Sequence, residues 1–489
     1  AGQYYVNRLN VKRFLQPGRN VIAVHVYYQG LINRAYNSGD YRQGCIAELW
    51  CDDQLLAATD DTWRAMRFTS NQPGAKYGYD TQFAEWIDAR LFDQDWASID
   101  YEDGHWPFAC IDANPDYHFV MQPTPVVSVY SVDPESVVKL AKGHYLIDFG
   151  QLLTGQFSMK AKGKEGSAVE IRCGEELLPS GDRVMHQTRS GCLYQDKWIL
   201  SGKEDRFETF DYKGFRYVEV IEEDSGEEAV MPDTFHAVVR HYPFPDDNCL
   251  FRCDDERLNR IFDICKNGVK FGSQEHYVDC PTREKGQYLG DNTVIGHSHM
   301  LLTGDGRLYR KAIEQFARSA DICDGLMAVV PGHLMQEIAD YSLQWPMQVM
   351  EYYRFTGDLG FVEKMHPYAE RLLQHFQKHE RSDGLIHLVT DKWNLVDWPR
   401  ELRDGYDFPL SKPIGPGCHN VLNAFYIGCY QTVMQMRQLL GVHKENRLPL
   451  LKESYMQAFY DEEKRLFRDA EGSSHHALHS NVLPLLFQL

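Results

Sequence analysis

The residues best suited to chemistry lie in one short stretch, which reads YVDCPTREKGQYLGD over positions 277–291. Its polar members include Asp279, Arg283, Glu284, Tyr288 and Asp291. Carboxylates held near an arginine can have their pKa values pushed apart, so that one stays protonated while the others stay ionised. Glycosidic cleavage needs such a division, because an acid protonates the leaving oxygen and a base activates water. A solvated loop capped by Asp279 explains the same residue types, and on those types alone it is the favoured interpretation.

Two other stretches carry tryptophan together with a carboxylate. Residues 391–399 read DKWNLVDWP and contain Asp397 and Trp398, while residues 340–346 read DYSLQWP and contain Trp345. Tryptophan offers a large apolar face on which a sugar ring can stack. Tryptophans that anchor a core explain both stretches as well, and for Trp345 the core interpretation is favoured.

Other kinds of catalytic site are poorly supported. The chain has twelve cysteines but no CxxC pair, and His475, His476 and His479 have no further ligand at a spacing suited to zinc. It contains no GxSxG, GxxxxGK[ST] or HExxH motif and no strand-linked GxGxxG motif. We therefore expect acid–base chemistry by carboxylates, with no metal and no cofactor.

The composition narrows the class of partner. The 489 residues carry a net charge of −19, which argues against nucleic acid because duplex binding needs clustered cations. No apolar run reaches the roughly 18 residues that would span a bilayer. Aromatic residues make up 13% of the chain. This proportion suits sugar binding, although an aromatic-rich core is the favoured explanation. Neither the oligomeric state nor the cellular compartment follows from the sequence.

The first half of the chain has the patterns of strands. Residues 20–28 form a β-branched and aromatic run, and apolar residues alternate with polar ones over 157–161 and 169–173. These last two stretches predict a hairpin, and a further strand is expected at 213–220. Short strands separated by turns are typical of β-sandwiches, and a break near 107–125 divides them into two.

The pattern becomes helical near residue 245. Asp254 and Asp255 are candidate N-caps, followed by apolar residues at helical spacing over 258–269. Similar spacing predicts helices over 368–376 and 422–436. The second half is therefore expected to be an all-α domain that carries the carboxylate-rich stretch.

The segment Asp279-Cys-Pro-Thr-Arg-Glu284, followed by Gly286, Tyr288, Gly290 and Asp291, resembles the signature of the bacterial α-L-rhamnosidases of glycoside hydrolase family 78. Further segments resemble parts of the same family: HYLIDFGQ at 144–151, FDYKGFRYVEV at 210–220, LQPGRNVI at 15–22 and IDAR at 87–90. The resemblance implies β-sandwich modules at 1–125 (jelly-roll-like) and 126–243, followed by an (α/α)6 barrel at 244–489. Both ends of the natural protein are expected to be missing, which leaves the first sandwich and the barrel incomplete.

The resemblance also implies an inverting mechanism and a role for each matched residue. Glu284 takes the place of the general acid, and Asp279 and Asp291 take the places of carboxylates that hold rhamnose hydroxyls and tune that acid. Arg283 is expected to orient these carboxylates, and Tyr288 stands where the family usually has tryptophan. The sugar contacts are expected to include Asp397, Trp398 and, by region only, Trp345.

The general base of the family lies far downstream, so we expect it beyond Leu489, with Glu337, Asp340 and Glu401 as weaker substitutes. The expected substrate is a terminal α-L-rhamnosyl unit of a glycoside or polysaccharide fragment, in a bacterial protein of unknown compartment. Two alternatives stay open. One is a carbohydrate-binding protein without catalysis, and the other is a related (α/α)6 glycosidase or phosphorylase for another sugar.

Overall fold

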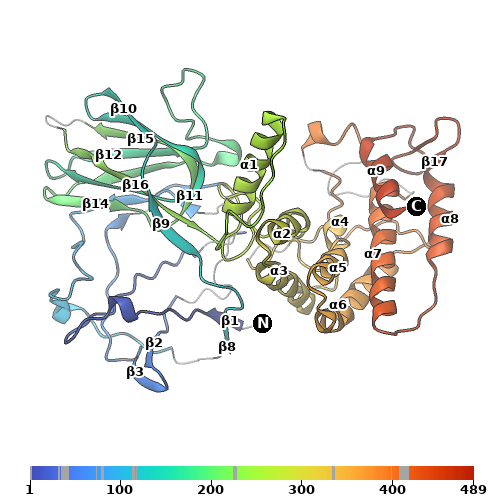
Figure 1. The fold of residues 1–489 in the computed structure, drawn as a ribbon, viewed down its shortest axis with the longest axis horizontal. Coiled ribbons are helices and arrows are strands. Elements are labelled where there is room, and N and C mark those ends of the chain that lie inside the picture. Colours follow the sequence, from blue (N-terminus) through green and yellow to red (C-terminus); the bar gives the residue numbers. More distant parts are fainter. Residues whose placement is uncertain are drawn as a thin grey trace. The chain divides into compact units, whose positions relative to one another are not determined.

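The structure, a computed structural model, describes residues 3–489 apart from several short stretches. Those outside the description are 31–33, 35–42, 73, 79–81, 113–115, 117, 224–227, 333–335, 398 and 407–417. The chain divides into two compact units. The sheet unit comprises Ala1–Asn33, Asn37–Pro243 and Cys280–Lys285, and the helical unit comprises Arg34–Tyr36, Phe244–Asp279 and Gly286–Leu489. The expectation of a sheet-rich first half and a helical second half is thus confirmed (Figure 1).

A ten-stranded sheet forms the centre of the sheet unit. Its strand order is β4 (Asn71–Gln72), β7 (Trp86–Asp88), β13 (Gln195–Ile199), β12 (Ala168–Gly174), β15 (Lys213–Glu223), β11 (His144–Lys162), β16 (Val230–His241) and β9 (Ser128–Val132). The long strand β11 also pairs with β10 (Ser136–Ala141) and β14 (Glu204–Glu208). All pairs are antiparallel except β7 with β13.

Shorter ladders complete the described strands. They are β1 (Gln3–Val6) with β8 (His118–Met121), β2 (Glu48–Cys51) with β3 (Gln54–Ala58), β5 (Lys76–Tyr77) with β6 (Gln82–Phe83), and, in the helical unit, β17 (Tyr460–Asp461) with β18 (Leu466–Phe467). The division between sandwich modules at 125/126 stays a prediction.

The core of the sheet unit follows from the alternation of side chains along each strand. In β12, Val169, Ile171 and Cys173 are buried while the residues between them are half-buried. Trp198 of β13 and Phe207 of β14 are fully buried and in ring contact, with centroids 5.6 Å apart. Because side chains alternate between the two faces of a strand, this pattern buries one face of the sheet.

Two of the strand predictions are wrong. Residues 157–161 and 169–173 do lie in β11 and β12, but these strands form no hairpin because β15 lies between them. Alternation predicts which face is buried and leaves the pairing partner open. Residues 20–28 are all described and form no strand, and most of them are exposed. The strand expected at 213–220 is confirmed as part of β15.

The helical unit is built of short to medium helices packed side by side. They are α1 (Glu256–Phe271), α2 (Leu289–Thr303), α3 (Arg307–Arg318), α4 (Ala339–Ser342), α5 (Trp345–Thr356), α6 (Leu359–Gln377), α7 (Asn420–Leu439), α8 (Leu448–Phe459) and α9 (Leu478–Phe487). Helix α7 is buried around most of its circumference because α4, α5, α6, α8 and α9 all pack against it. The three predicted helices are confirmed within α1, α6 and α7. Among the described residues no helix combines the length and apolar character needed to cross a bilayer.

Caps fix several of these helix ends. The Asp255 carboxylate accepts a hydrogen bond from the backbone N–H of Arg257 (2.9 Å) at the start of α1, as predicted. The Asp358 carboxylate does the same for Phe361 (2.9 Å) at the start of α6. Gly357 ends α5 with a φ of 72°, a left-handed conformation that glycine adopts without steric cost.

Helices α2 and α3 approach closely because Gly296 has no side chain. A Cβ added at Gly296 would lie 2.2 Å from a ring carbon of Tyr309, which is itself fully buried. Gly268 of α1 offers a natural comparison, since nothing lies within 4 Å of the same position.

We expect Gly296→Ala to destabilise the helical unit by roughly 1–3 kcal/mol, because the added methyl group overpacks the contact with Tyr309. Gly268→Ala should stabilise it by about 0.5–1 kcal/mol, because alanine has the higher helix propensity. Urea unfolding followed by helical circular dichroism measures both. Equal effects of the two substitutions would show that the α2–α3 contact is loose.

Candidate active site

The carboxylate-rich stretch is shared between the two units. Residues Cys280–Lys285 belong to the sheet unit, whereas Asp279 and the residues from Gly286 onward belong to the helical unit. Glu284 and Arg283 are therefore positioned by the sheet unit. Asp279, Tyr288 and Asp291 are positioned by the helical unit.

A pair of hydrogen bonds joins the two ends of the loop that carries Glu284. The Asp279 carboxylate accepts from the backbone N–H of Gly286 (3.0 Å), and the backbone N–H of Asp279 donates to the Gly286 carbonyl (2.8 Å). This ring holds the ends of the intervening segment together. Asp279 therefore has a structural bond in addition to its predicted role toward a sugar.

Within the sheet unit, Lys285 fixes the same loop from its other side. Its ammonium donates to the Gln82 side-chain carbonyl and to the Tyr212 backbone carbonyl, both at 2.6 Å, and lies 4.1 Å from the centre of the Tyr212 ring. The Gln82 amide also donates to the Thr282 carbonyl (3.2 Å). Lys285 is only 4% exposed, and burial lowers its pKa to about 8. Its φ of 54° adds a local turn directly after Glu284.

Glu284 and Arg283 lie together on this loop. The Arg283 Nε is 3.5 Å from a carboxylate oxygen of Glu284, and their side chains are 22% and 13% exposed. Arg283 also acts on Glu175, whose pKa is raised by burial and by Glu176 and lowered by the guanidinium. Glu284 is thus a partly shielded carboxyl group beside a fixed cation.

The start of helix α2 brings the remaining members of the motif together. Tyr288 is the N-cap residue and Asp291 lies in the first turn, where the helix dipole favours a negative charge. The Tyr288 hydroxyl accepts a hydrogen bond from Arg34 Nε (2.5 Å). Between them, Gly290 leaves room for the ring of Tyr341, since a Cβ at Gly290 would lie 2.4 Å from a ring carbon.

Tyr341 of α4 stands in a group of acidic side chains. Burial, followed by the charges of Asp291 and Asp340, raises the pKa of its hydroxyl well above the ordinary range, and Tyr288 and Asp397 add to this effect. Asp340 itself is 4% exposed, and burial raises its pKa to about 7, with a further contribution from Asp397. The structure therefore brings together two predicted residues of the motif, Tyr288 and Asp291, with Asp397 from a distant segment.

A short two-segment ladder holds Asp340 and the approach to Asp397 in place. The backbone N–H of Trp393 donates to the Glu337 carbonyl (3.0 Å), and that of Ala339 donates to the Trp393 carbonyl (2.8 Å). The Asp340 carboxylate accepts from the backbone N–H of Leu395 (3.1 Å). Next to this ladder is an apolar cluster against which Tyr341 packs, formed by Ala328, Ile338 and Leu395.

Other predicted residues lie elsewhere or outside the description. Trp345 is fully buried, and its indole N–H donates to the Ile313 carbonyl (3.1 Å). A ring without exposed surface cannot stack on a sugar, so Trp345 serves the core of the helical unit. Trp398 lies outside the described residues.

Sequence reasoning missed Tyr341 and Lys285. Tyr341 lies four residues before Trp345 in the chain. Its contact with Gly290 joins two distant segments, so no local sequence pattern predicts it. Lys285 belongs to the motif itself, but its type suggests an exposed residue rather than a buried one. Trp393, whose side chain belongs to the predicted aromatic cluster, is 45% exposed.

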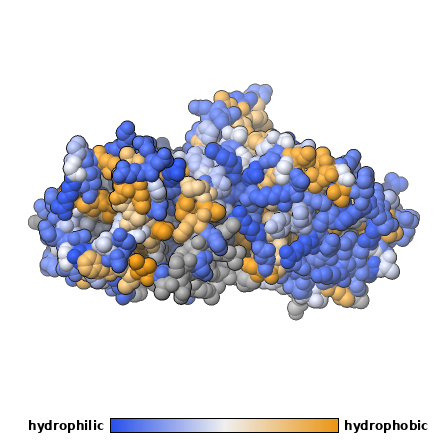
Figure 2. Space-filling view, turned by 90° about the horizontal axis from the view of Figure 1, so that it is seen from below, coloured by the Kyte–Doolittle hydropathy of each residue, from blue (hydrophilic) through white to orange (hydrophobic). Residues whose placement is uncertain are grey.

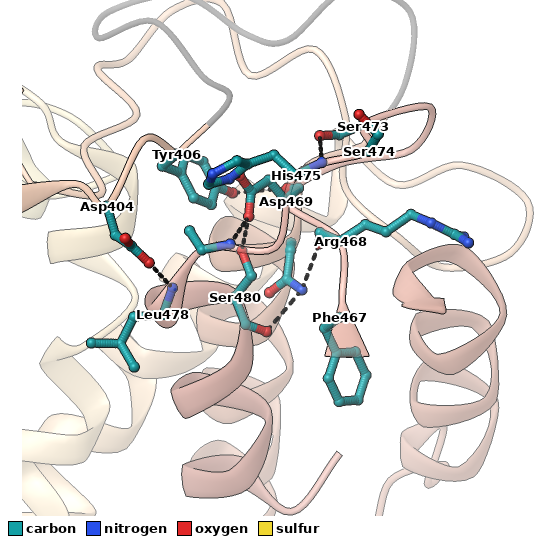
Figure 3. A network of polar contacts seen from close by, with 12 residues as sticks. Asp404, Tyr406, Phe467, Arg468, Asp469, Ser473, Ser474, His475, Leu478 and Ser480 are labelled. Carbon is teal, nitrogen blue, oxygen red and sulfur yellow. Dashed lines mark hydrogen bonds and ion pairs between the residues drawn. The ribbon is translucent and has the colours of Figure 1, made fainter. Parts of the chain in front are cut away.

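Two of the three histidines near residue 475 contact carboxylates, and Figure 3 shows one of them, His475 beside Asp469. His475 Nδ1 is 2.6 Å from Asp469, and His476 Nε2 is 3.3 Å from Asp461. The fully buried Asp469 also accepts from Ser480 Oγ (2.7 Å) and from the backbone N–H of Ala477 (2.8 Å). This network fastens α9 to the preceding loop.

The three residues named as weaker substitutes for the general base differ in their ion pairs and in their exposure to solvent. Glu337 forms an ion pair with Lys392, whose side chain is 1% exposed. Asp340 is buried, whereas Glu401 is exposed in a single 3₁₀ turn at Arg400–Leu402.

Two family models match the chain in order. The bacterial alpha-L-rhamnosidase concanavalin-like domain matches residues 138–241, and the bacterial alpha-L-rhamnosidase 6 hairpin glycosidase domain matches residues 246–489. The first corresponds to most of the ten-stranded sheet, and the second to the helices together with the carboxylate-rich stretch.

Individual relatives agree with these models. An alpha-L-rhamnosidase of Formosa agariphila is 24% identical over 432 residues, which cover 82% of this chain and 43% of the relative. The crystal structure of a GH78 family rhamnosidase of Bacillus sp. GL1 superposes with a TM-score of 0.83 at 16% identity, covering 94% of this chain and 71% of that one. A Streptomyces avermitilis alpha-L-rhamnosidase complexed with L-rhamnose gives a TM-score of 0.69 at 20% identity, covering 91% and 41%. The chain spans less than half the length of the curated relatives that it matches.

The buried Asp340 predicts a pH-dependent stability. Its pKa of about 7 in the folded state exceeds its ordinary value of 3.8, so between these pH values the folded protein holds a proton that the unfolded chain has released. Stability must therefore fall as the pH rises. Asp340→Asn removes this loss. Relative to the variant, the wild type should lose roughly 2–3 kcal/mol between about pH 5 and pH 8, since one pKa unit corresponds to about 1.4 kcal/mol.

Urea unfolding of the helical unit at the two pH values measures this difference. Asp321→Asn, at an exposed position, is the matched control and should follow the wild type. A constant difference between wild type and Asp340→Asn would mean that Asp340 titrates like an exposed aspartate.

Proposed function

We propose that this chain, which belongs to the bacterial α-L-rhamnosidase family (glycoside hydrolase family 78), supplies the acid and the sugar-binding carboxylates for hydrolysis of terminal α-L-rhamnosyl bonds. The observation that carries the proposal is the group of acidic side chains around Tyr341. There Asp291, Asp340 and Asp397 act together on Tyr341, in the domain that the glycosidase model matches. The substrate is a glycoside or polysaccharide fragment that ends in α-L-rhamnose.

In this proposal Glu284 is the general acid. A leaving alkoxide is too basic to depart unaided, so a carboxylic acid must protonate the glycosidic oxygen as the bond breaks. The loop that carries Glu284 is joined at its ends through Asp279 and Gly286 and is held within the sheet unit through Lys285. Such anchoring supports the role because an acid catalyst works only from a fixed position.

The residues around Tyr341 are proposed to hold the sugar. Asp291 and Asp397 accept hydrogen bonds from hydroxyl groups, and Asp279 contributes a further carboxylate. Tyr288 and Tyr341 supply aromatic surface to the less polar face of the ring, with a hydroxyl at each edge. In place of the buried Trp345, the proposal thus assigns Tyr341 as an aromatic contact of the helical unit.

The helical unit is proposed to be part of an (α/α)6 barrel. Helix α1 exposes Leu258, Ile261 and Ile264 (49%, 54% and 71%), and α9 exposes Leu485 and Leu486 (78% and 65%). Apolar faces of this kind are what successive helices of a barrel bury between them. Hydrophobic patches among hydrophilic residues are also visible on the face drawn in Figure 2.

The mechanism is proposed to be inverting, with a base that follows Leu489 in the natural protein. An inverting enzyme places its two carboxyl groups about 6.5–9.5 Å apart so that water fits between substrate and base. Glu337 is unsuited to this task because Lys392 already neutralises it, and Asp340 is unsuited because it is 4% exposed.

We expect Glu284→Gln, in the whole natural protein, to lower kcat on alkyl α-L-rhamnosides by about 10²–10⁴-fold, the usual contribution of general acid catalysis. On aryl rhamnosides with activated leaving groups the loss should be much smaller, because such groups depart with little protonation. Release of the alcohol from a series of rhamnosides measures both effects.

The matched control is Glu165→Gln, which makes the same chemical change at an exposed turn of the sheet unit. It should leave the whole series unchanged. If Glu284→Gln kept wild-type turnover on the poorest leaving groups, the acid would have to be another residue. If the wild type and Glu284→Gln both bound rhamnose and neither of them cleaved any rhamnoside, the chain would be a carbohydrate-binding protein.

A further inference from the structure

We propose that His375, His379 and Asp391 form a binding site for one divalent transition-metal ion, of which Zn²⁺ is the best match. His375 lies in the last turn of α6, and His379 lies in the turn that follows the helix. Asp391 lies on the segment that leads to Trp393 and Asp397. The site is separate from the proposed acid and sugar-binding residues, so the proposal stands independently of the hydrolytic function.

The ligand atoms already face one another. His379 Nε2 is 3.7 Å from Asp391 Oδ1, and His375 Nε2 is 3.9 Å from Asp391 Oδ2. One atom from each of the three residues lies within 4.8 Å of the other two. In a tetrahedral zinc site with bonds of about 2.0–2.2 Å, neighbouring ligand atoms stand roughly 3.3–3.6 Å apart. Side-chain movements that shorten the widest of these separations by at most about 1.5 Å would therefore complete the geometry.

The spacing of the two histidines suits the task. Residues four apart on a helix share one face, and a histidine pair of this kind is a recurrent zinc-binding element. The backbone N–H of His379 donates to the Phe376 carbonyl (2.9 Å), which continues the coil of the chain beyond the end of α6. The two rings come to 6.2 Å between centroids.

The imidazole of His375 has unsatisfied hydrogen-bonding capacity. Its side chain is 14% exposed, yet neither of its ring nitrogens has a hydrogen-bond partner among the described residues. A shielded nitrogen without a partner is energetically unfavourable, and a metal bond removes that cost. Burial also lowers the pKa of both histidines, which favours the neutral imidazole that metals bind.

Lys392 orients the Asp391 carboxylate and does not cancel its negative charge. Its ammonium is 3.0 Å from Asp391 Oδ2, so Oδ1 faces His379. The same ammonium also pairs with Glu337, whose charge balances that of the lysine. Asp391 therefore keeps its negative charge for the ion. Metal-binding carboxylates are commonly held by such an outer hydrogen bond.

The donor set selects the class of metal. Two imidazoles and one carboxylate suit Zn²⁺ and its neighbours, whereas Ca²⁺ and Mg²⁺ prefer an all-oxygen site. Asp391 is 49% exposed, so the ion can enter from solvent and keep a water molecule as its fourth ligand. Once bound, the ion would fasten the end of α6 to the segment that carries Trp393 and Asp397.

Equilibrium dialysis of the whole chain against Zn²⁺ alone tests the site. The wild type should bind one Zn²⁺ per chain. His379→Gln and Asp391→Asn should bind it at least about tenfold more weakly, because losing even an outer partner of a ligand costs about 10–100-fold and these variants lose a ligand itself. Both positions are partly exposed, so both variants should fold, which circular dichroism verifies. His443→Gln, at an exposed position after α7, is the matched control and should bind like the wild type.

Two further readouts accompany the dialysis. Zn²⁺ should raise the Tm of the wild type and of His443→Gln but not of the two ligand variants, because an ion that binds only the folded state stabilises it. Co²⁺ in place of Zn²⁺ should give visible absorption typical of tetrahedral coordination, and the ligand variants should lack it. Equal Zn²⁺ binding by the wild type and both ligand variants would overturn the proposal, and so would an unchanged Tm of the wild type. Either result would leave the hydrolytic function untouched.

Discussion

The close approach of the Tyr341 ring to the backbone of α2 at Gly290 sets the geometry of the helical part of the site. No side chain larger than hydrogen fits there, since a Cβ would lie 2.4 Å from the ring. The contact brings α4 against the first turn of α2, so that Asp291 from one helix and Asp340 from the other act on the same phenol. The ladder between residues 337–339 and 393–395 then brings Asp397 to this group.

Acidic groups that lie close together repel one another when they are charged. The fold reduces this repulsion in a different way for each residue. Asp291 lies in the first turn of a helix, where the dipole favours its charge. Asp340 is instead buried, and its raised pKa shows that the charged form is disfavoured. On the loop of the sheet unit, Glu284 has Arg283 beside it, and the buried Lys285 anchors the backbone that follows. The chain thus combines a fixed loop for an acid with a preorganised set of hydroxyl-binding groups.

Local patterns in the sequence located several helices and strands correctly, failed at residues 20–28, and did not predict which strands pair. The Asp255 cap and the apolar spacing after it located α1, and alternation located β11, β12 and β15. The pairing of β11 with β15 instead of β12 could not be predicted, because alternation fixes the buried face and not the neighbour. The motif likewise singled out Glu284 and Asp291 as candidates, and the core interpretation favoured for Trp345 agrees with its burial. The contact of Tyr341 with Gly290 and the grouping of His375 with Asp391 join distant segments, which no local pattern predicts.

The measurement that tests this account most directly is the affinity of the whole natural protein for L-rhamnose in the Gly290→Ala variant, by titration calorimetry. The added methyl group must displace Tyr341 from α2, and a misplacement of about 1 Å can cost on the order of a hundredfold in a preorganised site. We predict at least a tenfold weaker affinity, by roughly 1.4 kcal/mol or more. Gly268→Ala, which makes the same change in open space, should bind rhamnose as the wild type does. Unchanged affinity in a folded Gly290→Ala protein would show that the contact between Tyr341 and Gly290 does not organise the site.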